Sequence, residues 1–190
     1  MPTIVETEVY TLDELAALGD ERVVERALDW MREAFDDVAV EHVSEYLADA
    51  LKAANLPGLT ITGWDYWHGT VDIEGEVTAH DLASIPPGHF LGDVSFPHVE
   101  WVEGVSLGTR RAFDYGHKLW IDMAEDAPFG CFDDAYADLI ADAIAWQRTI
   151  ERRLASRMTG VYEAETSRAY MLELARANGY TFTVEGKWFG

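Results

Sequence analysis

Carboxylates recur at every fourth position near the start of the chain, and this spacing constrains the fold more than any other feature. The acids of this row are Glu21, Glu25, Asp29, Glu33, Asp37, Glu41, Glu45 and Asp49. Residues four apart lie on one side of an α-helix, and the apolar residues between these acids follow the 3.6-residue period. The pattern predicts an amphipathic helix over residues 20–54, and it leaves open a break near residues 36–40.

The same row predicts a strongly negative surface. Like charges at this spacing oppose helix formation by about 0.2–0.5 kcal/mol per pair, so the row has a cost for folding. The chain has 35 acidic and 14 basic residues and a net charge of −21. Such a charge disfavours binding to nucleic acid or to an anionic membrane and favours a basic partner.

Two further groups of acids are included in the predicted partner-binding surface. The first group shares one face of a predicted strand, and the second shares one face of a predicted helix. They are Asp72, Glu74 and Glu76, and Asp134, Asp138 and Asp142. Two interpretations stay open: the carboxylates imitate the phosphates of a duplex and occupy a basic groove, or they only confer solubility, as in a salt-loving host.

The remaining segments predict an α+β fold. Polar and apolar alternation predicts strands over residues 3–10, 59–67, 70–77, 94–107, 111–123 and 180–184, with Gly108 and Thr109 joining the fourth and fifth. Capping and periodicity predict helices that begin at the Thr11 to Glu14 capping box, within residues 78–92, and over 132–162 and 165–177. We expect one α+β domain, residues 1–190, in which a mainly antiparallel sheet packs against two long helices and one shorter C-terminal helix.

Signals for catalysis and metal binding are weak. His98 and Glu100 on one strand and His117 on the next form a conceivable metal cluster, and His42 is expected in the core. The single cysteine, Cys131, excludes an internal disulfide framework and is expected to be a small buried residue. No serine-hydrolase, phosphate-loop or dinucleotide motif occurs. We expect no cofactor and no enzymatic activity.

An aromatic run lies at residues 64–68, Trp-Asp-Tyr-Trp-His. Its rings are expected to pack a hairpin, although stacking on a base or sugar, or anchoring a partner, stays open.

Both ends of the chain carry a resemblance to known sequences. Residues 10–15 read Tyr-Thr-Leu-Asp-Glu-Leu and 27–30 read Ala-Leu-Asp-Trp, while 178–187 read Asn-Gly-Tyr-Thr-Phe-Thr-Val-Glu-Gly-Lys. Together with Thr-Gly-Trp-Asp at 62–65, these motifs resemble an uncharacterised family of small acidic proteins encoded by bacteriophages and prophages. The resemblance covers about half the chain, leaves residues 78–130 unmatched and supplies no catalytic residues. It implies a phage origin.

These observations predict a non-enzymatic, phage-type protein that inhibits a basic, nucleic-acid-handling host complex. Such a DNA mimic would act as an anti-CRISPR or anti-restriction protein, through protein contacts and without binding nucleic acid directly; a homodimer stays open. The absence of an 18-residue apolar run and of a leader-like start predicts a location in the bacterial host cytoplasm. Two alternatives are a small metal-dependent enzyme that uses the strand histidines and a structural or accessory virion protein.

Overall fold

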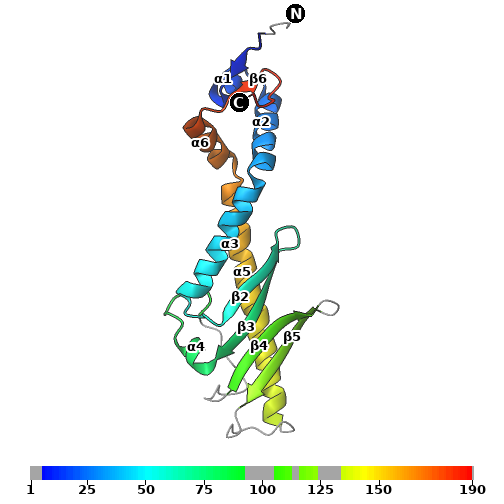
Figure 1. The fold of residues 1–190 in the computed structure, drawn as a ribbon, viewed down its shortest axis with the longest axis vertical. Helices are drawn as coiled ribbons and strands as arrows, with labels where there is room; N and C mark the ends of the chain where they lie inside the picture. The colour runs from blue at the N-terminus through cyan, green and yellow to red at the C-terminus, as the bar shows by residue number, and fades with distance from the viewer. Residues whose placement is uncertain (1–5, 93–104, 113–115, 124–133, 190) are drawn as a thin grey trace, which may run out of the picture. The chain divides into compact units, whose positions relative to one another are not determined.

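The computed structural model describes residues 6–92, 105–112, 116–123 and 134–189, which are drawn in colour in Figure 1. Within these ranges, six helices combine with two separate antiparallel sheets, so the α+β class is confirmed. Contacts divide the chain into two compact units, Met1–His42 with Val161–Gly190, and Val43–Gly160. The division falls inside two helices, α3 (Asp36–Ala53) and α5 (Asp134–Glu165).

The first unit begins with the predicted capping box. Thr11 Oγ1 accepts a hydrogen bond from the backbone N–H of Glu14 (3.2 Å), whose carboxylate accepts one from the backbone N–H of Thr11 (2.8 Å). This box starts α1 (Leu12–Ala17), and Gly19 at φ +80° turns the chain toward α2 (Glu21–Ala34). Both halves of the box satisfy backbone donors that a helix start leaves unpaired, which explains why so short a helix begins there.

The two ends of the chain meet in the first unit. Strand β1 (Val9–Tyr10) pairs antiparallel with β6 (Phe182–Thr183), which follows α6 (Arg168–Asn178) and its left-handed Gly179 cap. A strand was expected over residues 3–10. Of these, residues 6–10 are described, and only Val9 and Tyr10 form the strand. A common core lies between these elements and comprises Leu12, Leu15, Val24, Ala27, Leu28, Met31, Met171, Ala175 and Phe182.

The long helix expected over residues 20–54 is two helices. The break that the sequence left open lies at Phe35, where φ −111° and ψ 11° depart from helical values between α2 and α3. Phe35 is half-buried, and its ring stacks on Tyr180 with 5.8 Å between ring centroids. The break thus accompanies packing of an aromatic side chain against the C-terminal segment.

The second unit contains a four-stranded sheet in the order β2-β3-β4-β5 (Figure 1). The hairpin of β2 (Leu59–Asp65) and β3 (Thr70–Thr78) lies where the sequence places it, and α4 (Ala79–Ala83) follows from a second capping box. Strands β4 (Val105–Ala112) and β5 (Gly116–Met123) complete the sheet. Residues 94–104 of the expected fourth strand lie outside the described residues.

The turn expected at Gly108 and Thr109 is wrong. Gly108 is paired with Trp120 and Thr109 with Leu119 inside the ladder, which continues as far as Ala112 opposite Gly116. A glycine marks a turn only when the strand ends near it, and here backbone pairing extends for several more residues.

The core of the second unit combines strand and helix periodicities. Val71, Ile73 and Val77 of β3 are buried at alternate positions. The helix residues of this core recur every three or four positions: Val43, Leu47 and Leu51 on α3, and Ala143, Trp146, Ile150, Leu154 and Met158 on α5. This buried stripe agrees with the apolar face that defined the helix expected over residues 132–162.

Candidate functional site

The first part of the acidic row is paired with arginines of the same unit. Arg168 Nη1 contacts the carboxylates of Glu21, at 2.5 Å, and of Glu25. Arg32 Nη1 lies 2.6 Å from Asp29 Oδ1 and 3.8 Å from Glu25 Oε2. Arg168 thus joins α6 to α2, and the contacts of Arg168 and Arg32 compensate much of the charge of these three acids.

The second part of the row is exposed and uncompensated. Its members, here called the exposed acidic row, are Glu33, Asp37, Glu41, Glu45 and Asp49. All five side chains are exposed, and none forms an ion pair with a residue that the structure describes. Lys52 is the only lysine or arginine on α3, so this helix carries little positive charge of its own. Four-residue spacing on α3 places successive carboxylates roughly 6 Å apart along the helix axis.

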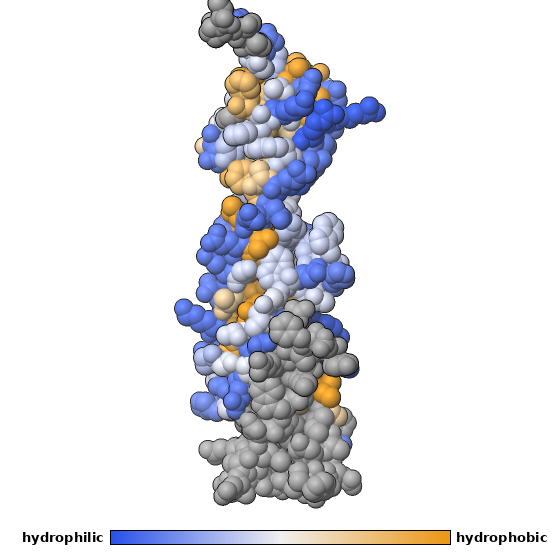
Figure 2. Space-filling view, turned by 45° about the vertical axis from the view of Figure 1, so that its right-hand side comes forward, coloured by the Kyte–Doolittle hydropathy of each residue, from blue (hydrophilic) through white to orange (hydrophobic). Residues whose placement is uncertain are grey.

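Apolar side chains are exposed beside these acids on α3. Val38 is 41% exposed and Tyr46 is 36% exposed. Helix geometry makes Val38 a surface neighbour of Glu41, and Tyr46 a neighbour of Asp49. Figure 2 shows that hydrophilic residues predominate on the visible face, with hydrophobic residues in small separate groups. Tyrosine is enriched where protein interfaces form.

The acids of β3 share one face, as expected, but they differ in exposure. Asp72 and Glu74 are half-buried and take part in other interactions, whereas Glu76 is exposed. The buried side chains of β3 alternate with them. Of this group, Glu76 has the most surface to offer a partner.

The acids of α5 do not form an exposed row. Asp138 is exposed, but Asp142 is only 1% exposed, and the side chain of Asp134 lies outside the described residues. Asp142 shares the buried side of the helix with Ala143 and Trp146, which places its carboxylate out of a partner's reach. The i, i+4 spacing predicts that these acids share one side of the helix. Which of them are exposed to solvent depends on the side of the helix that packs against the core.

The candidate metal cluster lies mostly outside the described residues. His98, Glu100 and Cys131 are not described, and of His117 only its backbone place in β5, opposite Arg111, is known. Among the residues that are described, no group of three His, Cys, Asp or Glu side chains could hold a metal ion.

His42 is not the core residue expected. Its side chain is 43% exposed, and Nδ1 lies 3.2 Å from Glu165 Oε2. His42 precedes the buried Val43 on α3, and its ring contacts the carboxylate of Glu165.

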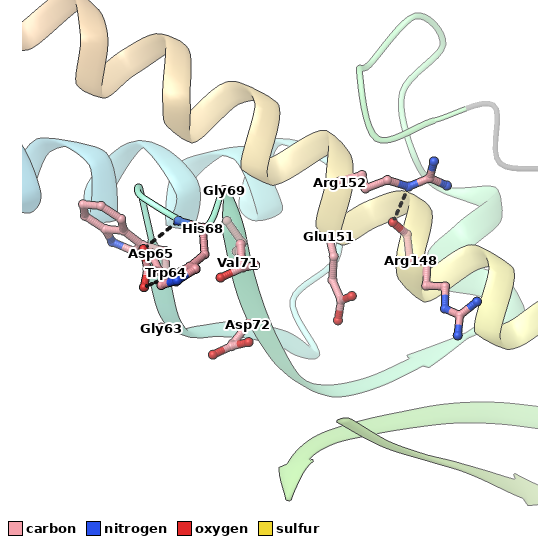
Figure 3. A pocket seen from close by; sticks show the side chains of 11 residues that line it. Gly63, Trp64, Asp65, His68, Gly69, Val71, Asp72, Arg148, Glu151 and Arg152 are labelled. Carbon is pink, nitrogen blue, oxygen red and sulfur yellow. Dashed lines mark hydrogen bonds and ion pairs between the residues drawn. The ribbon is translucent and has the colours of Figure 1, made fainter. Parts of the chain in front are cut away.

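A pocket in the second unit is a separate candidate site, and its helix wall was missed by sequence reasoning. It has a volume of about 850 Å³ and lies between the β2-β3 hairpin and α5 (Figure 3). Its lining residues are Gly63, Trp64, Asp65, His68, Gly69, Thr70, Val71, Asp72, Arg148, Glu151 and Arg152. The hairpin wall contains part of the aromatic run, whereas the helix wall comes from a segment about 80 residues further along the chain.

A short hydrogen-bonded pair fixes the tip of the hairpin. Asp65 Oδ2 lies 2.7 Å from His68 Nδ1, and Asp65 Oδ1 accepts a hydrogen bond from the backbone N–H of His68 (3.0 Å). The hydrogen bond from the His68 side chain, followed by that from its backbone, lowers the pKa of the Asp65 carboxyl. Trp67 at this tip is 87% exposed: its ring packs edge-on against Tyr66, with 5.4 Å between ring centroids, and most of it faces solvent instead of packing the hairpin as expected.

This lowered pKa predicts an acid-sensitive hairpin tip. Because folding lowers the pKa of Asp65 below its ordinary value of 3.8, the interaction is fully present above pH 3.8 and is lost as pH falls through the folded-state value. We expect the backbone amide resonance of His68 to titrate in that acid range by NMR. In Asp65→Asn the acid titration of this resonance should disappear, and its persistence would refute the assignment to Asp65.

No family model, curated protein or solved structure matches this chain. None of the described helices is both long enough and apolar enough to cross a membrane. The resemblance of the chain ends to a phage family stays a prediction.

Proposed function

We propose that this chain is a non-enzymatic binding protein whose exposed acidic row contacts a basic surface of a nucleic-acid-handling complex in the cytoplasm of a bacterial host. The observation that carries the proposal is the contrast between two parts of a row of acids that are spaced four residues apart in the sequence. Glu21, Glu25 and Asp29 are paired with arginines of the same unit, whereas the five acids from Glu33 to Asp49 are exposed without such partners. A basic partner would supply the missing countercharges.

The charge spacing suits competition with a nucleic acid. Carboxylates four residues apart on α3 rise by roughly 6 Å per step. Successive phosphates of one strand of a duplex are about 3.4 Å apart along the helix axis, so every second phosphate is about 6.8 Å from the one before it. The row would therefore meet cations that are arranged to receive about every second phosphate of a strand. Complementary charge raises the association rate, and occupation of the groove would exclude the nucleic acid.

The exposed apolar side chains on α3 favour a protein contact over a purely solubilising role. Solubility requires charge, but it does not require Val38 and Tyr46 to be exposed among the acids. Burial of these side chains would add the apolar contact that holds an electrostatically guided complex together.

Affinity purification from a bacterial lysate tests the proposal. The tagged chain is incubated with lysate at low and at high salt, and the retained proteins are identified by mass spectrometry. We expect a nucleic-acid-binding complex that is retained at low salt, lost at high salt and displaced by added duplex DNA. Retention that is insensitive to DNA, or a stoichiometric metal in the purified chain with no partner, would contradict the proposal and favour a different class of function.

A further inference from the structure

The tip of the β2-β3 hairpin presents the most exposed large apolar side chain among the residues that the structure describes. Trp67 is 87% exposed, with its ring packed edge-on against Tyr66. It does not line the pocket beside the hairpin, so that pocket does not cover it. An indole that stays in water contributes little to folding, whereas tryptophan is enriched among the residues that dominate binding energy at protein interfaces.

The turn that carries this indole is ordered by its own hydrogen bonds. Asp65 is hydrogen-bonded to both the side chain and the backbone N–H of His68 (Figure 3). The backbone N–H of Gly69 donates to the carbonyl oxygen of Tyr66 (3.2 Å), and Gly69 has φ +60°, which glycine adopts without strain. Because the backbone is already fixed, a partner that covers Trp67 orders little more of the chain on binding.

The hairpin around this indole is acidic throughout. Between residues 59 and 78 the sequence has the acids Asp65, Asp72, Glu74 and Glu76 and no lysine or arginine. The described residues place no cation over the ring of Trp67. The face of an indole attracts a cation, and carboxylates on the same hairpin add to that attraction. The same charge repels a second copy of this hairpin and an anionic lipid surface, so a basic partner is the occupant that fits.

A hydrogen bond joins the hairpin to the part of α3 that carries the end of the exposed acidic row. The indole N–H of Trp64 donates to Ser44 Oγ (3.1 Å), and Ser44 directly precedes Glu45. These residues all belong to the second unit. Three residues of chain span at most about 11 Å, so Trp67 lies within that reach of Trp64. A partner of ordinary interface size that contacts Glu45 can therefore also cover the hairpin tip.

We propose that Trp67 anchors the interface with the basic partner, and that an arginine of that partner stacks on its indole. The inference rests on the proposed function for the kind of partner. A guanidinium is planar, so it stacks on an aromatic face in a way that the compact ammonium of lysine does not. The exposed acidic row guides the partner to the chain, and Trp67 supplies a contact that excludes water and holds it there.

Two peptides of equal charge, nona-arginine and nona-lysine, test the stacking contact on the full chain. Fluorescence anisotropy of the labelled peptides at low salt measures their affinities. We expect Trp67→Ala to weaken nona-arginine by about two- to fivefold and to change nona-lysine less. In NMR spectra, the indole N–H resonance of Trp67, assigned by its loss in Trp67→Ala, should shift when nona-arginine is added.

Trp188→Ala is the matched control, because Trp188 is also exposed (46%) but belongs to the first unit. Circular dichroism verifies that each variant is folded. An unchanged Trp67 resonance, equal weakening of both peptides, or an equal loss in Trp188→Ala would overturn the inference. A dimer that depends on Trp67 in analytical ultracentrifugation, or a shift of its resonance with phosphatidylcholine vesicles in place of the peptide, would also overturn it by assigning the ring to a second copy or to lipid.

The captured partner separates this inference from the proposed function. Trp67→Ala should weaken that complex by at least about 30-fold, as at an interface hot spot. If reversal of charge in the exposed acidic row abolishes the complex but Trp67→Ala leaves its affinity unchanged, the proposed function stands and the inference fails. If charge reversal in the row has no effect, the proposed function fails, and the two peptides still decide whether Trp67 receives an arginine.

Discussion

Replacement of Glu33, Asp37, Glu41 and Glu45 by lysine is expected to abolish partner binding while the fold is retained. Like charges that face each other across an interface cost several kcal/mol, so affinity should fall by at least about 100-fold. The four side chains are exposed, and no described residue depends on them for an ion pair. The new lysines also attract Asp29 and Asp49 at the ends of the substituted stretch, so the thermal midpoint should stay unchanged or rise slightly. Affinity purification and thermal melting measure the two effects.

A control of equal charge change separates the row from the bulk charge of the chain. The control variant carries lysine at four exposed acids outside the row: Glu6, Glu8, Glu163 and Glu173. It changes the net charge by the same amount and should retain the partner at low salt. Equal loss of binding in both variants would show that only total charge matters, and unchanged binding in the row variant would refute the proposed contact.

Gly75→Ala is expected to destabilise the second unit by about 3 kcal/mol or more. Gly75 has φ +133°, a conformation that costs other residues about 1–3 kcal/mol. A Cβ there would also collide with the carbonyl oxygen of Gly58 on the neighbouring segment, and overpacking of this kind typically costs about 1–3 kcal/mol. Because the atoms nearest to this Cβ all belong to the backbone of Gly58 and Leu59, no flexible side chain can move to relieve the collision. Urea denaturation measures the change in the free energy of unfolding.

Gly160→Ala is expected to stabilise the protein, in contrast to Gly75→Ala. This glycine lies inside α5, and a Cβ added there meets no atom within contact distance. Alanine should therefore stabilise the helix by about 0.5–1 kcal/mol through its lower conformational entropy in the unfolded chain. A loss of stability in Gly160→Ala, or tolerance of Gly75→Ala, would contradict this account of the two glycines.

Local signals in the sequence predicted local structure well. The capping box at Thr11 and Glu14 is confirmed because its geometry involves only residues three apart. The two long helical segments and the first hairpin also lie close to their expected positions, because helical periodicity and strand alternation are properties of short stretches of sequence. Gly108 misled the strand prediction, since a glycine that continues a ladder has the same sequence signal as one that ends it.

The properties of the candidate sites depend on contacts between distant segments, which periodicity cannot reveal. Glu21 is compensated by Arg168, which lies 147 positions away in the sequence. The burial of Asp142 depends on how α5 rotates against its core. Arg148 reaches a pocket whose other wall comes from β2 and β3. The C-terminal part of the sequence is rich in arginines, namely Arg148, Arg152, Arg153, Arg157, Arg168 and Arg176, but this composition does not specify what they face.

Carboxyl footprinting of the chain, alone and in complex with the captured partner, tests the central claim most directly. Carbodiimide coupling labels accessible Asp and Glu side chains, and mass spectrometry locates each label. We predict that labelling of Asp37, Glu41, Glu45 and Asp49 falls on binding, while labelling of Glu163 and Glu173 stays constant. Equal labelling of α3 in the free and bound chain, with protection confined to other acids, would contradict the proposal that the exposed acidic row is the contact.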